Sequence, residues 1–361
     1  MILSENTLSL MEELTQIIGV SGNEKNISKT LQSYYKKYTD EIIYDNLGSI
    51  FAVKRSGKPN SKKVMICAHM DEAGFIVHEI KESGLIKILP IGNVFEQALI
   101  GKRVRVSTST GEIKGVIVTK SQSALSSDEK NKSIKSSNMF VDIGATSDKE
   151  VKECGIRLGN PIVVDGEFEA LLGGKRLVSK AWDNRYGCVL GIEILELLKD
   201  TKLDVDLYVG CTVQNEIGLR GCITATNLIA PDMAIVLDCL HSNDINGNED
   251  NTGKLGEGVL VSFYDKSMMP NRTLLNHLIE ICETKEIKHQ YYYSMDDGDG
   301  GWIHKLLEGC PTLKVCICSR NTKTNSSIID AYDYINAKKS LLEVIKSLDD
   351  ELITMFKSEN R

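Results

Sequence analysis

The sequence lacks the features that mark a membrane-spanning or exported protein. No run of about 18 apolar residues occurs, the length at which a segment becomes a candidate for crossing a bilayer. The N-terminal stretch MILSENTLSL has neither the cationic part nor the apolar part of a signal peptide. No block of Lys and Arg stands out in a chain of net charge −7, which argues against nucleic acid as the main partner. We therefore expect a cytoplasmic protein with neither a nucleic-acid nor a membrane partner.

The 10 cysteines include no Cys-x-x-Cys pair, so the sequence offers neither a thioredoxin-like motif nor a zinc knuckle. Many of them lie in apolar runs such as VMICAHM and LKVCICS. Reduced, buried thiols are the simple interpretation when no export signal is present. The composition, 42% hydrophobic and 26% charged, is that of an ordinary globular protein. A chain of 361 residues suffices for two domains or for one large domain with an insert.

The pattern of apolar residues changes twice along the chain. Behind a capping Ser4, apolar residues repeat at helical spacing until Gly19. From about residue 74 to residue 165, short alternating strands separated by Gly turns replace this pattern. The polar stretch 121–138 within that region is expected to form a mobile surface loop. After Lys180, helices again alternate with buried strands.

These patterns predict the following elements: helices over 4–18, 23–38, 184–200 and, as one amphipathic helix, 333–357; buried strands over 64–67, 203–213, 232–239 and 311–319. We interpret residues 1–73 and 166–361 as one discontinuous α/β domain. Residues 74–165 are then a β-rich insert within it.

Side chains suited to a metal follow several of the predicted strands. His69 and Asp71 come after VMICA, and Glu216 follows LYVGCTVQN; Asp238 ends MAIVLD, and Asp183 opens the helix after SKAW. Since the carboxyl ends of the strands in an open α/β sheet meet at one crevice, we expect these groups to converge. One imidazole and three carboxylates suit Zn, Co or Mn. Asp71 would accept the second ring N–H of His69 and fix its tautomer.

Each of these residues also has an ordinary structural interpretation. A lone His after a strand is often a hydrogen-bonded structural residue, and Asp183 could cap the helix that follows. Glu216 and Asp238 could be acids in exposed turns. Taken together, however, four such groups at buried strand ends are costly unless something compensates their charge, which favours a metal.

Several motifs in the same order resemble the dinuclear metallo-aminopeptidases that include the tetrahedral, glutamyl and deblocking aminopeptidases. The motifs are GVSGNE, AHMDEAGF, VDIGATSDKEVKECGIRLGNP, SKAWDNRYGC, TVQNEIGLRG, VLDC and YDKSM, and they span nearly the whole chain. The resemblance implies a zinc-peptidase-like three-layer α/β/α catalytic domain interrupted by a β-barrel-like dimerisation domain. It also implies cytoplasmic particles, from dimers up to dodecamers, that trim the N-terminal residues of short peptides with metal-activated water.

The resemblance also implies roles for single residues. His69 and Asp238 resemble ligands of the first metal, Asp183 resembles the carboxylate that bridges both metals, and Glu216 resembles a ligand of the second metal. The family has a glutamate as general base at the position of Asn215. An amide has no titratable site near neutral pH and cannot take a proton from water, so we expect impaired catalysis.

A second departure lies in CICSRNTKTNSSIIDAYD, where the family has a histidine ligand of the second metal. An ungapped alignment puts Lys323 at that position, and a shift by two would put Asn325 there. An ammonium has no lone pair for a metal. His304 is the nearest imidazole in the sequence, and we expect it to face outward on a helix. The family's Gly-Thr-Asp turn is also altered, to DDGDGG at residues 296–301.

The sequence therefore predicts one divalent ion (Zn, Co or Mn) and a vacant second site, in which Lys323 pairs with Glu216 or Asp183. Two classes of function remain. The first is a metallo-aminopeptidase with weak or no activity; the alternative is a non-catalytic peptide-binding or assembly subunit of an aminopeptidase particle. Carbohydrate hydrolysis fits less well because it needs a free pair of carboxylates.

Overall fold

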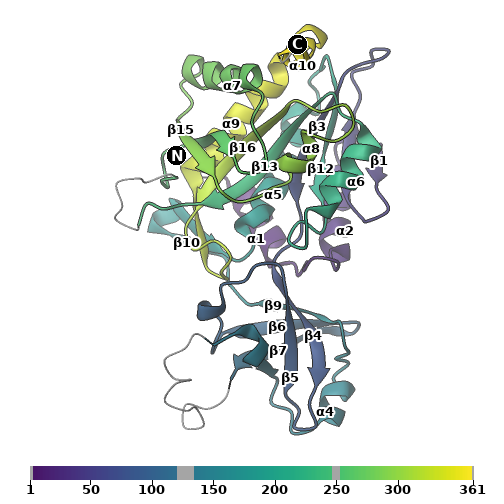
Figure 1. Cartoon of the computed structure of the whole chain (residues 1–361), viewed down its shortest axis with the longest axis vertical. Coiled ribbons are helices and arrows are strands. Elements are labelled where there is room, and N and C mark those ends of the chain that lie inside the picture. The colour runs from purple at the N-terminus through teal and green to yellow at the C-terminus, as the bar shows by residue number, and fades with distance from the viewer. Residues whose placement is uncertain (1–2, 120–133, 246–252, 360–361) are drawn as a thin grey trace.

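The computed structural model describes residues 3–119, 134–245 and 253–359, and two bodies of structure follow one another along its long axis (Figure 1). The upper body is built on an eight-stranded sheet of order β1-β2-β12-β3-β13-β16-β14-β15. The strands are β1 Ile42–Tyr44, β2 Ile50–Lys54, β12 Asp206–Thr212, β3 Lys63–His69, β13 Met233–His241, β16 Thr312–Ser319, β14 Val259–Asp265 and β15 His289–Ser294. Neighbours among β12, β3, β13 and β16 pair in parallel, so the carboxyl ends of these strands lie at one edge.

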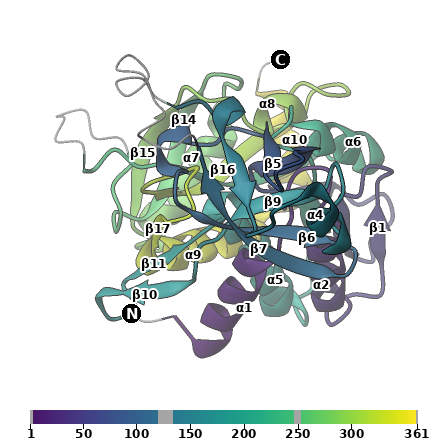
Figure 2. The ribbon, with the colours of Figure 1, turned by 90° about the horizontal axis from the view of Figure 1, so that it is seen from below.

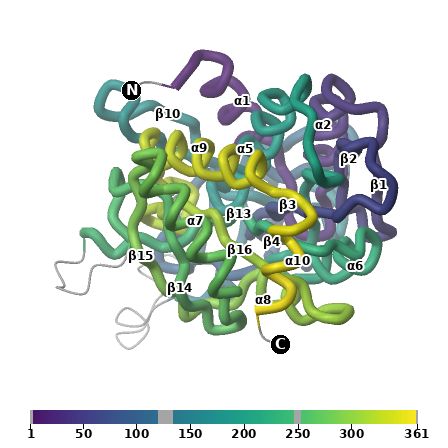
Figure 3. Tube along the Cα trace, turned by 90° about the horizontal axis from the view of Figure 1, so that it is seen from above, coloured from purple at the N-terminus to yellow at the C-terminus, as the bar shows by residue number. Residues whose placement is uncertain are grey.

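Helices cover both faces of this sheet. One face packs against α1 Glu5–Gln16, α2 Lys25–Tyr35, α5 Trp182–Leu198, α7 Arg272–Thr284, α9 Ala331–Ser347 and α10 Asp350–Ser358. The other face packs against α6 Arg220–Ile229 and α8 Gly300–Ile303. Seen from above, α5 and α9 lie on one side of the central strands, and α6 and α8 lie on the other (Figure 3). Within β3, Ile66 belongs to the first core whereas Met65 and Cys67 belong to the second, which explains the continuous apolar run.

The lower body is a closed barrel of order β4-β5-β8-β7-β6-β9. Its strands are β4 Gly74–Ile80, β5 Ile86–Ile91, β8 Phe140–Asp142, β7 Gly111–Val118, β6 Arg103–Thr108 and β9 Pro161–Val164. The barrel has its own apolar core, and the view from below looks onto its strands (Figure 2). The predicted fold class, a three-layer α/β/α domain interrupted by a β-barrel, is confirmed. The limits 74–165 and the dimerisation role of the insert stay predictions.

A smaller sheet joins β10 Glu169–Leu171, β11 Arg176–Ser179 and β17 Ser327–Asp330. Short helices complete the described structure: α4 Asp148–Glu153 and the 3-10 turns η1 Glu96–Ala98, η3 Ser136–Asn138 and η4 Leu172–Gly174. Among the described residues, no helix combines the length and the apolar character that crossing a membrane requires.

Two element predictions need comment. The single C-terminal helix predicted over 333–357 is wrong, because Leu348 is extended and the Asp349 carboxylate accepts the Leu352 N–H at 2.8 Å to start a new helix. Of the loop predicted over 121–138, residues 121–133 lie outside the described residues. Its last part is the 3-10 turn η3.

Candidate metal centre

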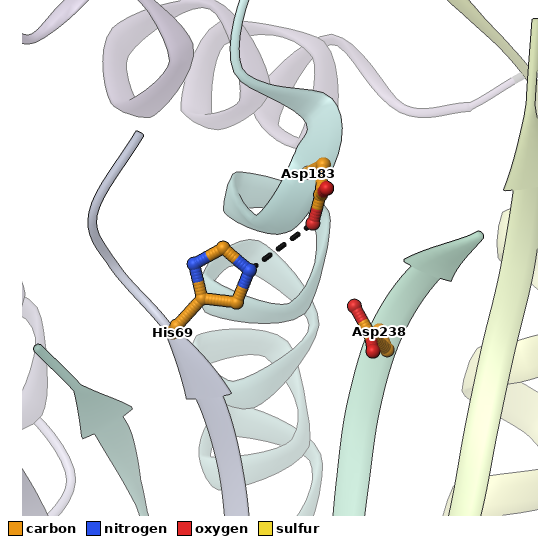
Figure 4. Close-up of side chains that lie close together, drawn as sticks. All are labelled: His69, Asp183 and Asp238. Atoms are coloured by element: carbon orange, nitrogen blue, oxygen red, sulfur yellow. Dashed lines mark hydrogen bonds and ion pairs between the residues drawn. The ribbon is translucent and has the colours of Figure 1, made fainter. Parts of the chain in front are cut away.

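Three side chains from separate elements meet above the carboxyl edge of the sheet. His69 is the last residue of β3, Asp238 lies in the neighbouring strand β13, and Asp183 lies in the first turn of α5. One ligand atom from each lies within 4.8 Å of the other two, and all three side chains point toward one another (Figure 4). The register of β3 and β13, both parallel, carries His69 and Asp238 to the same edge.

The His69 ring is almost completely buried and is held at both nitrogens. Its Nε2 lies 3.1 Å from Asp183 Oδ1, and its Nδ1 lies 3.1 Å from the main-chain oxygen of Asp71 and 3.5 Å from Asp71 Oδ1. The nearer partner of Nδ1 is therefore the carbonyl, whereas the sequence suggested the carboxylate. Burial lowers the pKa of His69, but the Asp183 and Asp71 carboxylates outweigh this effect and raise it well above its usual range.

The fully buried Asp71 carboxylate ties the end of β3 to the turn after β12. It accepts the main-chain N–H groups of Asn215 and Glu216, each at 3.0 Å, and the hydroxyl of Ser21. Burial raises the pKa of Asp71, but hydrogen bonding and charge from His69, with these donors, bring it below its usual value. Asp71 therefore fixes the positions of three groups at the site without reaching into the cluster itself.

Asn215, predicted from the sequence to stand at the position of the family's base, acts as a hydrogen-bond donor. Its side-chain Nδ2 donates to Asp299 Oδ1 at 2.7 Å, and the Thr212 hydroxyl donates to Asp299 Oδ2 at 3.0 Å. Asp299 belongs to the turn at residues 296–301 and is buried, which raises the pKa of its carboxyl. A glutamate at position 215 would set a second carboxylate against Asp299, so the amide suits this neighbour.

Glu216 lines the same cavity as His69, Asp183 and Asp238 but is not part of the three-residue group. Its Oε2 is 3.4 Å from the main-chain N of Asn93, a residue of the barrel. Burial, and then the charge of Asp183, raise the pKa of Glu216 to about 7.

Lys323 also lines this cavity, but its predicted ion pair with Glu216 or Asp183 is wrong. The side chain is exposed, and within the described part of the chain its ammonium forms no ion pair. Lys323 has φ 66°, so the backbone passes through the left-handed region at this residue. Asn325, the alternative position, donates its amide to the main-chain oxygen of Asp165. His304 is partly buried, with Nδ1 3.0 Å from the Gly300 oxygen.

Two charged residues beneath the site, Lys314 and Asp265, were not predicted from the sequence. Lys314 lies in the middle of β16 and is 3% exposed, and its Nζ contacts the buried Asp265 carboxylate and lies 3.9 Å from Asp238 Oδ2. Burial raises the pKa of Asp238 to about 6 even though this ammonium opposes the effect. The signals in the sequence were a lysine in the apolar run PTLKVCICS and the aspartate of the motif YDKSM.

The donor set fits a divalent cation. One imidazole nitrogen and two carboxylate oxygens converge, and a buried cluster of this kind is typical of three-ligand sites that leave further positions open. His69, Asp183 and Asp238 would hold such an ion. Glu216 lies close enough to Asp183 and His69 for their charges to act on its carboxylate, but it is not part of the three-residue group.

Comparison with known proteins gives a consistent result. The family described as M42 glutamyl aminopeptidase matches residues 48–339. A glutamyl aminopeptidase of Lactococcus lactis subsp. cremoris is 30% identical over 361 residues, which cover 96% of this chain and 98% of that protein. A lysyl aminopeptidase of Pyrococcus furiosus is 30% identical over 350 residues, covering 94% and 98%. The solved structure of a TET aminopeptidase from a marine sediment archaeon of the Thaumarchaeota has a TM-score of 0.93 at 32% identity, covering 98% and 99%.

Proposed function

The chain belongs to the M42 glutamyl aminopeptidase family, and from that premise we propose that it is a one-metal member with weak or no peptidase activity. Its chemistry would be the removal of N-terminal residues from short peptides. The observation that carries the impairment is the bond from Asn215 Nδ2 to Asp299 Oδ1, because it puts an amide donor at the position of the base. Site chemistry decides function where the fold alone does not.

In this proposal His69, Asp183 and Asp238 hold one divalent ion (Zn, Co or Mn), and Asp71 orients the His69 ring. When bound, such an ion polarises a carbonyl oxygen and lowers the pKa of water. The Asn215 side-chain oxygen can accept a hydrogen bond from a water but cannot take its proton. Position 215 therefore offers no group that can accept a proton from water.

The proposal leaves the second site of the family vacant. Glu216 would be its remaining ligand, while Lys323 replaces the histidine and is exposed. An ammonium near that position repels a second divalent ion and offers it no lone pair. We propose self-association through residues 74–165 and a cytoplasmic location on the strength of the family resemblance. The preferred N-terminal residue stays open, since the two relatives are named for glutamyl and lysyl activity.

Metal content and turnover test this function together. We expect the purified chain to retain about one equivalent of Zn, the capacity of one three-ligand site. Hydrolysis of aminoacyl anilides and short peptides should be slower than in the relatives by about 10²–10⁴, the usual contribution of a general base. Two bound equivalents together with turnover at the rate of the relatives would overturn the proposal.

A gain-of-function pair sharpens the test. Asn215→Glu combined with Lys323→His should bind a second metal ion and raise activity, whereas either change alone should do little. Asn215→Gln keeps the amide and is the matched control, and Asn325→His tests the alternative register. If Asn325→His recruits the second ion and Lys323→His does not, the assignment of position 323 is wrong.

The second candidate is a non-catalytic peptide-binding or assembly subunit. The hydrogen bond from Asn215 to Asp299 favours it as well, because it leaves no base at position 215. Saturable binding of a short peptide with a free N-terminus, without cleavage over hours, would select this candidate. Measurable turnover that is abolished by His69→Ala would reject it.

A further inference from the structure

A buried ion pair lies directly beneath the metal centre. Lys314 and Asp265 are 3% and 1% exposed, and Lys314 Nζ contacts Asp265 Oδ2. The other oxygen of Asp265 accepts the Ser267 hydroxyl at 2.6 Å and the Ser267 N–H at 2.9 Å. Burying two charges is costly, so a pair retained in the core indicates a role beyond packing.

The ammonium of Lys314 also faces a candidate metal ligand. It lies 3.9 Å from Asp238 Oδ2, at the outer limit of an ion pair, while Asp238 Oδ1 accepts the main-chain N–H of Cys239 at 2.9 Å. One oxygen of Asp238 is thus held by the backbone and the other faces the ammonium. Of the three clustered ligands, only Asp238 has an ammonium this close among the described residues.

The altered turn at residues 296–301 closes over this ammonium because it carries glycine there. A Cβ on Gly298 would lie 3.2 Å from Lys314 Nζ and 3.6 Å from Asp238 Oδ2. A Cβ on Gly300 would lie 3.7 Å from Lys314 Cε. The Lys314 ammonium therefore fills the space next to the backbone of Gly298. The turn keeps this ammonium close to Asp238.

We propose that Lys314, paired with Asp265, is a positioning residue that partly neutralises Asp238 and thereby weakens the hold of the His69, Asp183 and Asp238 group on its divalent ion. This inference rests on the metal site of the proposed function. When the ion leaves, Lys314 is the cation that compensates Asp238, so the metal-free protein stays folded. The chain would exchange its ion readily instead of keeping it as a permanent structural part.

Two single variants should change Zn affinity in opposite directions, and a double variant serves as their control. Lys314→Met removes the cation and leaves Asp265 negative, so Zn should bind tighter by about tenfold or more. Asp265→Asn frees the ammonium to turn toward Asp238, so Zn should bind weaker by about tenfold or more. The double variant removes both charges and should bind Zn at least as tightly as the parent chain. A purely structural role predicts instead that both single variants weaken binding.

The measurement is Zn affinity by competition with a chromophoric chelator, together with urea unfolding of the metal-free proteins. We expect Lys314→Met to lower the stability of the metal-free form while it tightens Zn binding. Unchanged or weaker Zn binding by folded Lys314→Met overturns the inference. If that variant does not fold, the uncharged double variant decides: binding weaker than in the parent overturns it, and equal or tighter binding supports it.

His69→Ala separates this inference from the proposed function. If His69→Ala abolishes Zn binding and the Lys314 series shows no change, the metal site stands and only the role of Lys314 fails. If the parent chain and His69→Ala bind Zn equally, the site itself is wrong and both proposals fail.

Discussion

His69 and Asp238 are each held in place by neighbours outside the cluster, and Asp183 is held by His69 within it. Asp71 holds the His69 ring through its carbonyl, and Cys239 and Lys314 hold the two oxygens of Asp238. The register of β3 with β13 and the first turn of α5 position the three ligands. Preorganisation of this kind means that the loss of a single ligand is not made good by a mobile neighbour.

His69→Ala should therefore lower Zn affinity steeply, by about 10²-fold or more, since it removes one of about three protein ligands. Metal content after dialysis, measured by atomic emission, checks this. His78→Ala is the matched control, because His78 is exposed on the barrel strand β4. Equal metal content in the two variants would contradict the assignment of His69.

A second buried charge cluster lies close to the site and should give stability a distinct pH dependence. Lys180 is 2% exposed, and its Nζ lies 2.9 and 2.7 Å from the two carboxylate oxygens of Glu72. Burial lowers the pKa of Lys180 to about 8 although Glu72 opposes it, and Arg185 lowers it further. The pKa in the folded chain is thus below the ordinary 10.5 expected for the unfolded chain.

Between pH 8 and pH 10.5 the unfolded chain then binds more protons at Lys180 than the folded chain, so stability rises with pH across that window. Relative to Lys180→Met, the parent chain should gain up to about 3 kcal/mol, at about 1.4 kcal/mol per pKa unit. Urea unfolding of both proteins at intervals across the window measures this gain. Parallel pH profiles would show that the pKa of Lys180 is not lowered.

The convergence of His69, Asp183 and Asp238 was predictable from the sequence, because each lies at the end of a predicted strand or at the start of a predicted helix. The Lys314–Asp265 pair was not predictable, because that contact depends on β14 packing antiparallel beside β16. The wrong ion pair of Lys323 has a similar origin. The charge of Lys323 was visible in the sequence, whereas its exposure and its left-handed backbone were not.

At the scale of elements, helix and strand types were predictable and some ends were not. The Leu and Ile spacing runs through residues 333–357 without interruption, so periodicity alone predicts one helix. In the structure a new helix, α10, begins where Asp349 acts as its N-cap. This cap is hard to recognise in the sequence because two further acidic residues, Asp350 and Glu351, follow it directly. The barrel was predictable as a β-rich insert since its short strands alternate and end at glycines.

The barrel should be removable as a unit. Its core shares no buried residue with the two cores of the α/β layers, although Ile18 and Val20 pack against Val163 of β9 in a small separate cluster. Phe75 pairs with Ile162, so both ends of residues 74–165 lie close together. Replacing that segment by a short Gly-Ser linker should leave a cooperatively unfolding domain that still binds Zn. It should lose the contact from Asn93 to Glu216 but keep His69, Asp183 and Asp238. Aggregation, or loss of the cooperative transition in urea, would contradict this.

At the scale of the whole molecule, both bodies contribute residues to the proposed site. The α/β layers carry every residue of the candidate metal group, and the barrel supplies Gly92 and Asn93 at the rim beside Glu216. A Cβ on Gly92 would lie 2.7 Å from Glu216 Oε2, so only glycine allows the barrel loop to approach this carboxylate so closely. The insert therefore shapes the site directly in addition to any part in assembly.

The same deletion tests how the chain assembles. A chain of 40.0 kDa that dimerises through residues 74–165 should sediment as an even multiple of that mass, up to about 480 kDa for a dodecamer. The deletion variant should sediment as a monomer at every concentration tested, because the surface that pairs two chains has been removed. Leu172→Asp is the matched control, since Leu172 is 75% exposed and lies outside the barrel, and it should keep the parent mass. A deletion variant that still sediments with the parent particle would place the contact between chains on the α/β layers instead.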